Sequence, residues 1–599
     1  MLIRDYIDTG CEAGSYDDIR SYEELKNKFK IHIPENFNFA FDVVDRYAAE
    51  KPGRRAIVWC DDACERIISF GCLAKETNKA ANFLTALGVK KGDAVMLILR
   101  RRYEFWFFLL ALHKIGAIAA PATNMLLEKD LVYRNNAAGI KMIVTLDDPH
   151  LQTEAEEALS ASPTVKHLVT VGPDRAGWTR YRSACFSETF QRPEGKEAAG
   201  NSDIMLLYFT SGTSGNPKMV LHNFTYPLGH IVTAKYWQNV QDNGLHFTVA
   251  ETGWGKAMWG KIYGQWLSGS AVFVYDMLSF MPRKLLEKIW RYRITTFCAP
   301  PTVYRYLVKT NLKKFDLSSL RHCTTAGEAL NPEVSNKFTE MTGLEIREGF
   351  GQTETTLIVG TFPWMKVKPG SMGRPAPGYD VDIVDGEGRS CRAGELGEIV
   401  LRLDGGHPFG MFSGYYNDEA LTREAFSGNI YHTGDIASRD EDGYFWFSGR
   451  TDDMIKSSGF RISPFEVESV LQQHPAVLEC AVTGVYDPQR GQVVKATVVA
   501  TPGYELNPAL ARELQDYVKL QTALYKYPRI VEFVDELPKT ISGKIRRGVI
   551  RAEEAAKNIG SKVMEITKNI RPRPRKAILD DRKTGKPAGL IDPSDPAYS

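Results

Sequence analysis

The most informative segment of this sequence reads Tyr208-Phe209-Thr210-Ser211-Gly212-Thr213-Ser214-Gly215-Asn216-Pro217-Lys218. An apolar run over residues 204–209, typical of a buried strand, leads into a loop of glycines and hydroxyls that a lysine closes. Glycines let backbone N–H groups curl around an anion without Cβ clashes, and hydroxyls add donors. We therefore expect a phosphate-binding loop in which Lys218 neutralises charge, with a plain flexible turn as the alternative. The segment is not a Walker A motif, because Met219 stands where that motif requires a hydroxyl.

Around this loop, short β-rich runs alternate with helix-like stretches from about residue 34 to residue 500. Residues 93–99 and 141–146 are typical of strands, and residues 73–87 are typical of a helix. Regular alternation of strand and helix predicts an α/β fold with layered, largely parallel sheets.

The chain has 599 residues, more than one hydrophobic core usually serves. A boundary is expected at Gly449-Arg450-Thr451-Asp452-Asp453, where a strand-like run ends and a compact α+β segment begins. We predict a large N-terminal domain over 1–449, a hinge at 450–453, a small C-terminal domain over 454–557 and an extended tail over 558–599. The tail contains the basic run Arg571-Pro572-Arg573-Pro574-Arg575-Lys576, which is either a docking segment or part of a solvated tail.

Composition excludes several classes of protein. The 75 Lys and Arg nearly balance the 73 Asp and Glu, so no global field for nucleic acid or an acidic membrane surface exists. Nine scattered cysteines argue against a disulfide framework and favour a reducing, cytoplasmic setting. The charged start of the chain is unlike a signal peptide. The apolar run at 105–112 is too short to span a bilayer, so we expect a buried helix and no integral membrane association.

Further segments follow the loop in a fixed order: Thr324-Thr325-Ala326-Gly327-Glu328-Ala329-Leu330-Asn331-Pro332, Gly349-Phe350-Gly351-Gln352-Thr353-Glu354-Thr355, Tyr431-His432-Thr433-Gly434-Asp435, the boundary segment 449–453, and Pro538-Lys539-Thr540-Ile541-Ser542-Gly543-Lys544. In this order the segments resemble the adenylate-forming superfamily. Residues 253–264 and 525–529 are similar to medium-chain acyl-CoA synthetases and their acetyl-CoA synthetase relatives. The resemblance covers about residues 35–555.

This resemblance implies an activity and its cofactors. A small-molecule carboxylic acid would attack the α-phosphate of ATP, with Mg²⁺ present, to give an acyl-adenylate and pyrophosphate; coenzyme A would then displace AMP. It also implies that 1–449 is an AMP-binding domain and that the small C-terminal domain is mobile. The acid is expected to be short to medium in chain length, with branched and aryl-substituted acids among the candidates. The oligomeric state is not predicted.

The resemblance assigns the nucleotide site to particular residues. Thr353 is expected at the α-phosphate and Glu354 at Mg²⁺, since a hard cation prefers oxygen ligands. Asp435 is expected to accept hydrogen bonds from the ribose hydroxyls, with Arg450 beside it. Gly327, Glu328 and Ala329 are expected against the adenine, with Gly349 and Phe350 on its other side, and Ala329 stands where many relatives have proline. The full set expected to contact ATP or AMP is Thr210, Ser211, Gly212, Thr213, Ser214, Gly215, Lys218, Gly327, Glu328, Ala329, Glu348, Gly349, Phe350, Gly351, Gln352, Thr353, Asp435, Arg450 and Arg461.

Lys544 is the residue expected to bridge the attacking carboxylate and the α-phosphate. In the family the small domain then rotates about a hinge, which here falls on Asp452, and presents a second face to coenzyme A. The residues expected on that face are Ser458, Gly459, Phe460, Arg461, Arg490, Lys519, Tyr527 and Arg529. Arg461 is thus a candidate for ATP in one conformation and for coenzyme A in the other.

The acyl pocket is expected near Trp254, Trp259 and Gly351. Acetate-specific relatives carry tryptophan where this chain has Gly351, so the glycine is expected to open room for a longer acid. Trp259 either limits the depth of the pocket or is a core residue. Two alternatives to the whole assignment are an adenylating ligase for a carrier protein and a non-catalytic nucleotide sensor. The absence of a carrier-like segment after residue 557 argues against the first, and the presence of Lys544 and Glu354 argues against the second.

Overall fold

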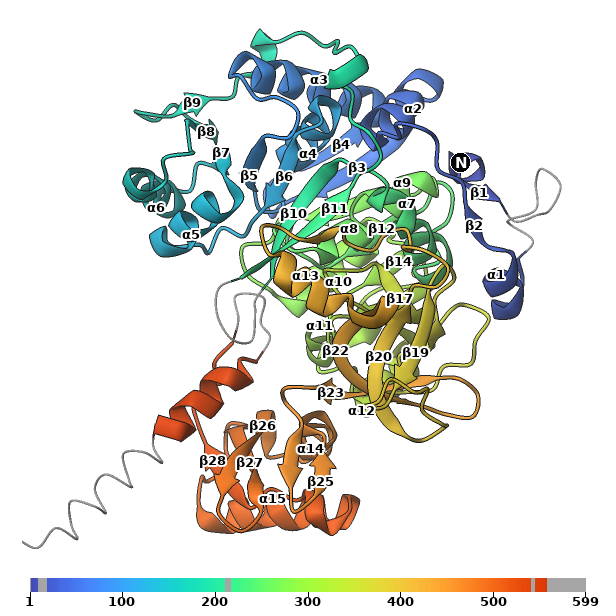
Figure 1. Cartoon of the computed structure of the whole chain (residues 1–599), viewed down its shortest axis with the longest axis vertical. Helices are drawn as coiled ribbons and strands as arrows, with labels where there is room; N and C mark the ends of the chain where they lie inside the picture. The colour runs from blue at the N-terminus through green and yellow to red at the C-terminus, as the bar shows by residue number, and fades with distance from the viewer. Residues whose placement is uncertain (1, 9–18, 211–216, 540–544, 557–599) are drawn as a thin grey trace, which may run out of the picture.

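A computed structural model describes residues 2–8, 19–210, 217–539 and 545–556 (Figure 1). Ser211, Gly212, Thr213, Ser214 and Gly215 of the expected phosphate loop lie outside these residues, as do Lys544 and the tail 558–599. A short N-terminal region carries β1 (Ile7–Asp8), α1 (Tyr22–Lys28), β2 (Lys30–Ile31) and α2 (Arg46–Glu50).

An eight-stranded sheet carries the entry to the phosphate loop. Its order is β21-β11-β10-β6-β5-β7-β8-β9, parallel from β10 to β9 and antiparallel at β10, β11 and β21. The bounds are β5 (Ala94–Ile98), β6 (Ile118–Pro121), β7 (Ile140–Leu146), β8 (His167–Val171), β9 (Thr179–Arg180), β10 (Ile204–Thr210), β11 (Lys218–Asn223) and β21 (Gly414–Tyr415). The strands predicted near 93–99 and 141–146 are confirmed as β5 and β7.

A nine-stranded sheet carries the expected adenine and α-phosphate segments. Its order is β18-β17-β16-β15-β14-β12-β13-β3-β4, and the strands from β16 to β3 are parallel. The bounds are β3 (Arg55–Cys60), β4 (Glu65–Ser69), β12 (Leu245–Thr248), β13 (Ala271–Tyr275), β14 (Thr296–Cys298), β15 (His322–Ala326), β16 (Ile346–Gly351), β17 (Leu357–Gly360) and β18 (Arg374–Pro375).

Helices cover these sheets and hold the two large cores together. In α4 every residue is buried, so the prediction of a buried helix at 105–112 is confirmed. Within the described part of the chain, no helix combines the length and apolar character needed to cross a membrane. The helices are α3 (Phe70–Ala86), α4 (Glu104–Ile115), α5 (Glu128–Ala138), α6 (Pro149–Ala158), α7 (Tyr226–Ile231), α8 (Lys256–Gly260), α9 (Tyr263–Leu267), α10 (Pro282–Arg291), α11 (Pro301–Leu307), α12 (Pro332–Thr342) and α13 (Glu419–Ala425).

Two smaller sheets follow. The first is antiparallel and consists of β19 (Asp380–Val384), β20 (Leu396–Arg402), β22 (Ile430–Arg439) and β23 (Phe445–Arg450). The second lies after residue 453 and consists of β24 (Ile455–Ser457), β25 (Phe460–Ile462), β26 (Val477–Asp487), β27 (Gly491–Ala500) and β28 (Ile530–Phe533). Around it are α14 (Pro464–Leu471), α15 (Pro508–Gln521) and a helix over 547–556.

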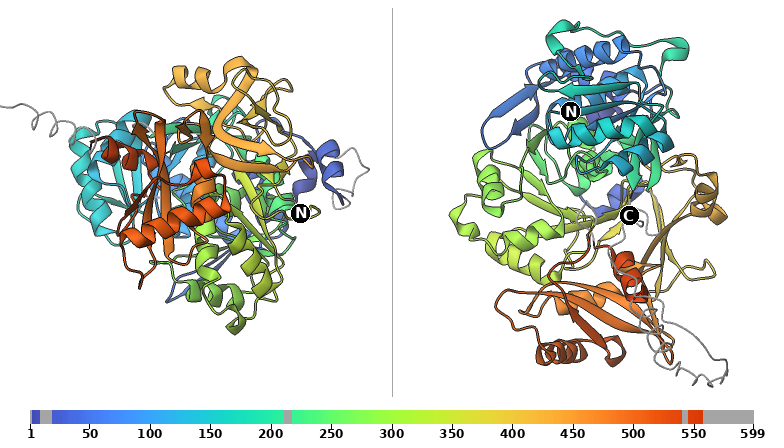
Figure 2. Two further views of the ribbon diagram at one scale, coloured as in Figure 1. Left: turned by 90° about the horizontal axis from the view of Figure 1, so that it is seen from below. Right: turned by 90° about the vertical axis from the view of Figure 1, so that its left-hand side faces the viewer.

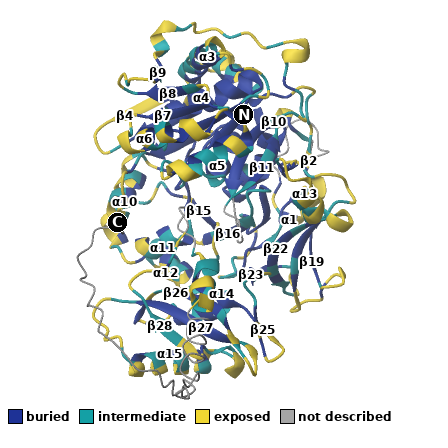
Figure 3. Ribbon diagram, turned by 60° about the vertical axis from the view of Figure 1, so that its left-hand side comes forward, coloured by how far each residue is buried: buried dark blue, intermediate teal, exposed yellow. Residues whose placement is uncertain are grey.

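The arrangement confirms the predicted α/β class. The sheet of β24–β28 (orange) sits at one end of the molecule, beyond β23 and α12 (Figures 1 and 2). Burial follows the sheets, whose strands are mostly dark blue, while exposed residues gather on outer helices and loops (Figure 3). Gly327 follows the end of β15, Gly351 ends β16 and Lys218 begins β11, so these expected site residues lie at strand ends.

Candidate active site

Parallel strands β15 and β16 bring the two segments expected at adenine side by side. Their register pairs Ala326 with Gly349, so the loop that begins at Gly327 leaves the sheet beside Phe350. Gly327 has φ +103°, a conformation that glycine tolerates and other residues rarely adopt. Gly327 and Glu328 are exposed, and Ala329 is half-buried. Gly327 and Glu328 of this loop are thus accessible at the edge of the sheet.

The side chain of Glu348 is buried and holds this loop by a hydrogen bond. Its two carboxyl oxygens accept the backbone N–H groups of Leu330 and Gly370, each at 3.1 Å. Burial raises the pKa of Glu348 to about 8. The sequence grouped Glu348 with residues that contact the nucleotide; its hydrogen bonds instead make it a residue that positions two loops.

The pKa of Glu348 predicts a pH-dependent contribution to stability. The folded protein holds this proton up to about pH 8, whereas the unfolded chain releases it near pH 4.5. The stability that Glu348 contributes is therefore complete below pH 4.5 and falls as the pH rises towards 8. Urea unfolding of wild type and Glu348→Gln measures their unfolding free energies between these two pH values. As the pH rises, wild type should lose unfolding free energy relative to the variant. A constant difference would mean that Glu348 is ionised throughout.

A polar network joins the segment expected at the α-phosphate to the aspartate expected at ribose. The Gln352 side-chain amide donates to the Asp435 carboxylate at 2.5 Å and to the Thr433 carbonyl at 2.8 Å, and it accepts from the Tyr431 hydroxyl at 2.7 Å. Arg450, which faces Asp435 across β22 and β23, donates to the same carboxylate at 3.2 Å. Asp435 is 5% exposed, so its charge is held in place before any ligand binds.

Tyr415 connects Glu354 to Lys218, the first residue of the strand after the phosphate loop. The Tyr415 hydroxyl donates to the Glu354 carboxylate at 3.0 Å, and the ammonium of Lys218 lies 5.2 Å from the centre of the same ring. Burial and the charge of Glu354 raise the pKa of Tyr415, so its hydroxyl keeps the proton that it donates. Thr210 pairs directly with Lys218 in the β10–β11 ladder. The structure therefore brings Lys218 and Glu354 to one place.

Thr353 is fixed from the opposite side by a histidine. The His222 ring nitrogen Nε2 lies 2.8 Å from the carbonyl oxygen of Thr353. Burial lowers the pKa of His222 to about 3, so the ring is neutral and donates from Nε2 to this carbonyl. A Cβ built on Gly255 would lie 3.5 Å from the Thr353 methyl, so Gly255 lies directly against the residue expected at the α-phosphate.

Trp259 and Gly351 meet at the expected acyl pocket. A Cβ built on Gly351 would lie 2.6 Å from the indole of Trp259 and 2.2 Å from the carbonyl oxygen of Thr356. Trp259 is 6% exposed and packs edge-on against Trp237 with ring centres 6.2 Å apart. The room beside Gly351 is thus filled by the Trp259 indole, which corrects the expectation that the glycine itself leaves space for the acid. Trp254 is half-buried at the start of the same segment.

Gly351→Ala is expected to destabilise the protein by about 1–3 kcal/mol, because the methyl group would overlap a backbone oxygen and a buried indole. Chemical denaturation measures this loss. Gly53→Ala is the matched control, since a Cβ on Gly53 would meet nothing within 4 Å. Equal stability of the two variants would show that the Trp259 side chain moves aside freely.

The residues expected at coenzyme A lie after residue 453, on β25, in the turns that contain Ser458 and Arg490, on α15 and in the segment just before β28. Phe460 stacks on Tyr525 with ring centres 4.2 Å apart. The Tyr527 ring lies between two cations, with the Lys519 ammonium 4.5 Å and the Arg529 guanidinium carbon 5.0 Å from its centre. The turn at Ser458 and Gly459 has φ values of +49° and +85°, and the Ser458 N–H donates to the Arg490 carbonyl at 2.9 Å. Arg461 is exposed on β25 and faces Lys456 in the β24–β25 ladder.

Three residues of the site were missed by sequence reasoning. Tyr415 and His222 belong to none of the recognised segments, and only the sheet pairing reveals them. Lys256 stands inside the segment 253–264 but was not singled out; its ammonium donates to the Ala326 carbonyl at 2.5 Å and lies 3.9 Å from a Cβ built on Gly327. A lysine next to the adenine loop could have been suspected from its place between two tryptophans.

Comparisons with known proteins agree with this geometry. A family model described as AMP-binding enzyme matches residues 44–416, and one described as AMP-binding enzyme C-terminal domain matches residues 466–544. The chain is 41% identical over 550 residues to human acyl-coenzyme A synthetase ACSM3, mitochondrial, covering 89% of this chain and 92% of the relative. It is 43% identical over 544 residues to human acyl-coenzyme A synthetase ACSM4, mitochondrial, covering 89% and 93%.

A crystal structure of the anthranilate CoA ligase AuaEII in complex with anthranoyl-AMP is similar with a TM-score of 0.79 and 30% identity, covering 87% of this chain and 98% of that one. A benzoate CoA ligase from Burkholderia xenovorans is similar with a TM-score of 0.74 and 27% identity, covering 86% and 100%.

Proposed function

Because the chain belongs to the family of AMP-binding enzymes, we propose that it is an acyl-CoA synthetase. It activates a short-to-medium-chain carboxylic acid with ATP to an acyl-adenylate and then transfers the acyl group to coenzyme A, releasing AMP. The observation that carries the proposal is the Gln352 network: the side chain that holds Asp435, the residue expected at the ribose, lies two residues before Glu354, whose carboxylate is bonded to Tyr415 beside Lys218.

The first half-reaction brings a carboxylate up to a polyphosphate, so negative charge must be screened. Lys218 and the 210–218 loop would hold the outer phosphates, and Thr353 would contact the α-phosphate. Asp435 and Arg450 would bind the ribose, while the Gly327–Ala329 loop and Phe350 would enclose adenine. Because Gln352 holds the Asp435 carboxylate and His222 holds the Thr353 carbonyl by hydrogen bonds, these two positions would be fixed before ATP binds.

Glu354 suits a Mg²⁺ ion that is shared with ATP. Within the residues that the structure describes, no cluster of three His, Cys, Asp or Glu side chains is arranged to hold a metal alone. Mg²⁺ is commonly bound by one or two carboxylates together with substrate phosphates and water, which matches a single glutamate beside a phosphate loop. The ion would neutralise phosphate charge, and the Tyr415 hydroxyl holds the Glu354 carboxylate that would bind it.

The second half-reaction needs the face of the small domain that carries Phe460, Tyr527 and Arg529. Cations stacked on Tyr527 suit the phosphates of coenzyme A, and the exposed Gly459 turn permits close passage of its pantetheine arm. Rotation about Asp452 would bring this face to the acyl-adenylate. The sequence predicted a cytoplasmic location, whereas the human relatives are mitochondrial by name, so the compartment of this chain stays a prediction.

The proposed function is tested by pyrophosphate release with purified enzyme over straight, branched and aromatic acids of two to twelve carbons, with and without coenzyme A. Thioester formation with coenzyme A is expected for acids of intermediate length. Pyrophosphate release without thioester, or thioester formed only on carrier proteins, would contradict it.

Trp259→Leu is expected to shift the preferred acid towards longer chains, because the smaller side chain lengthens the pocket. Each additional buried CH₂ contributes about 0.8 kcal/mol, so kcat/KM should rise about fourfold for each carbon that the enlarged pocket accepts. Trp290→Leu is the control, since Trp290 is 45% exposed on α10. An unchanged chain-length profile in Trp259→Leu would assign Trp259 to the core alone.

A further inference from the structure

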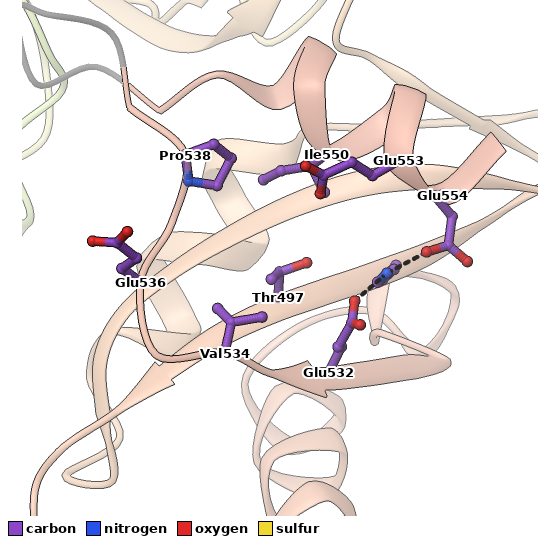
Figure 4. A pocket seen from close by; sticks show the side chains of 9 residues that line it. Thr497, Glu532, Val534, Glu536, Pro538, Ile550, Glu553 and Glu554 are labelled. Atoms are coloured by element: carbon purple, nitrogen blue, oxygen red, sulfur yellow. Dashed lines mark hydrogen bonds and ion pairs between the residues drawn. The ribbon is translucent and has the colours of Figure 1, made fainter. Parts of the chain in front are cut away.

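A second polar cleft lies in the sheet after residue 453, away from the proposed active site. It has a volume of about 280 Å³ and is enclosed by β27, β28, the segment at Pro538 and the helix 547–556 (Figure 4). Sites for cofactors and drug-sized ligands usually measure about 300–1,000 Å³, so this cleft suits the ends of side chains.

The cleft is acidic. Four glutamates line it together with one lysine. The Lys495 ammonium is 2.5 Å from both Glu532 and Glu554, and these pairs neutralise it (Figure 4). The side chains of Glu536 and Glu553, by contrast, make no hydrogen bond or ion pair with any described residue. The cleft therefore presents uncompensated carboxylates.

A buried hydroxyl adds a second acceptor. The Thr497 side chain rises from β27 into the space below the helix, is 4% exposed and has no hydrogen-bond partner among the described residues (Figure 4). Buried polar groups normally have a partner, so an unpaired hydroxyl indicates a ligand with donors. A metal ion fits poorly, because the described residues include no cluster of three His, Cys, Asp or Glu that could hold one. Guanidinium and ammonium groups fit, since they carry donors only.

We propose that this cleft binds the basic run Arg571–Lys576 of the same chain. Residues 557–576 contain seven lysines and arginines against one glutamate, a net charge of +6 that complements the cleft. Glu553 and Glu554 lie on the last turn of the helix from which this segment continues. Fourteen intervening residues reach about 45 Å when extended, so the run can return to the cleft.

Covalent attachment makes even weak docking effective. A short flexible connection gives an effective concentration of about 1 mM, which favours the docked state about tenfold when the intrinsic Kd is near 0.1 mM. The two prolines between the arginines restrict the free segment and lower the entropy lost on binding. Docking would brace the helix 547–556, whose N-terminal end follows the segment that carries Lys544.

Hydrogen exchange of the full chain tests the proposal. We compare wild type with Glu536→Gln/Glu553→Gln and with a tail variant in which Arg571, Arg573, Arg575 and Lys576 are glutamine. Both variants should raise exchange in the helix 547–556 about tenfold. Glu505→Gln, an exposed glutamate outside the cleft, should behave like wild type. Exchange unchanged in either cleft or tail variant would overturn the proposal.

Carbodiimide cross-linking identifies the occupant. This reagent joins carboxylates to amines, so wild type should give a link from Glu536 or Glu553 to Lys568 or Lys576. The link should form within single chains at every protein concentration and should weaken at about 0.5 M salt, where screening is short-ranged. Links found only between two chains, or none at all, would overturn docking of the chain's own segment and leave a second copy or another basic partner as the occupant.

Discussion

Replacing Lys544 with alanine is expected to slow acyl-adenylate formation by about 10²- to 10³-fold, the usual loss when one preorganised charge-stabilising donor is removed. The carboxylate and the α-phosphate are both anions, so a cation placed between them lowers the barrier to their approach. Lys218 and Lys256 are held by β11 and by the Ala326 carbonyl, so neither can take this place. Thioester formation from supplied acyl-adenylate should stay near the wild-type rate, because that step has no carboxylate attack.

Pyrophosphate exchange into ATP measures the first step, and coenzyme A consumption with supplied adenylate measures the second. Lys539→Ala is the matched control: this lysine lies five positions earlier and pairs with Glu479 at 2.6 Å. It should leave both rates nearly unchanged. Equal loss of both half-reactions in Lys544→Ala would assign the lysine to folding or coenzyme A binding, not to adenylation.

Much of the fold and the site could be predicted because they depend on local sequence. The strands at 93–99 and 141–146, the buried helix at 105–112 and the family resemblance were all confirmed. Ordered motifs also predicted that Thr353, Glu354 and Asp435 lie close together, and the side chain of the neighbouring Gln352 bonds to Asp435. Their roles at the nucleotide stay predictions. Short sequence patterns of fixed spacing identify these residues.

The remainder depends on contacts between distant segments, which no pattern in one sequence reveals. Tyr415 reaches Glu354 only because β21 pairs with β11 at the edge of the large sheet. The sequence predicted that Glu348 contacts the nucleotide. In the structure its buried carboxyl group accepts hydrogen bonds from the backbones of two loops. The space beside Gly351 is occupied by the indole of Trp259, a residue 92 positions earlier in the sequence.

The segment around the hinge shows how such contacts connect the two halves of the proposed cycle. On one side Arg450 donates to Asp435, the residue expected at the ribose; on the other side Asp453 accepts from Arg551 of the helix 547–556. Arg547 of the same helix lies 3.8 Å from Asp453 and forms a bidentate pair with Glu468, in which Nε donates at 3.1 Å to one carboxylate oxygen and Nη2 at 2.7 Å to the other. The helix that follows Lys544 is thereby fixed to the residue next to Asp452, so a rotation there would carry the lysine with it.

Arg547→Met is accordingly expected to cost about 3–5 kcal/mol of unfolding free energy, because Glu468 would be left buried without its cation. The Glu468 side chain is 6% exposed. Apart from Arg547, the only described hydrogen-bond partner of its carboxylate is the Val482 N–H at 2.8 Å. Burial raises the pKa of Glu468 while Arg547 lowers it, so removing Arg547 raises it further. The loss should therefore be small at acid pH, where the carboxyl is protonated, and should grow as the pH rises.

Denaturant unfolding between about pH 5 and pH 8 measures this loss, with Arg546→Met, an exposed neighbour, as the control. The double variant Glu468→Gln/Arg547→Met should recover most of the stability, since it removes the stranded charge and keeps an acceptor for Val482. If the double variant is no more stable than Arg547→Met, the arginine acts through packing of its stem. A recovered fold with normal thioester formation but slow adenylate formation would instead show that the pair positions the segment carrying Lys544.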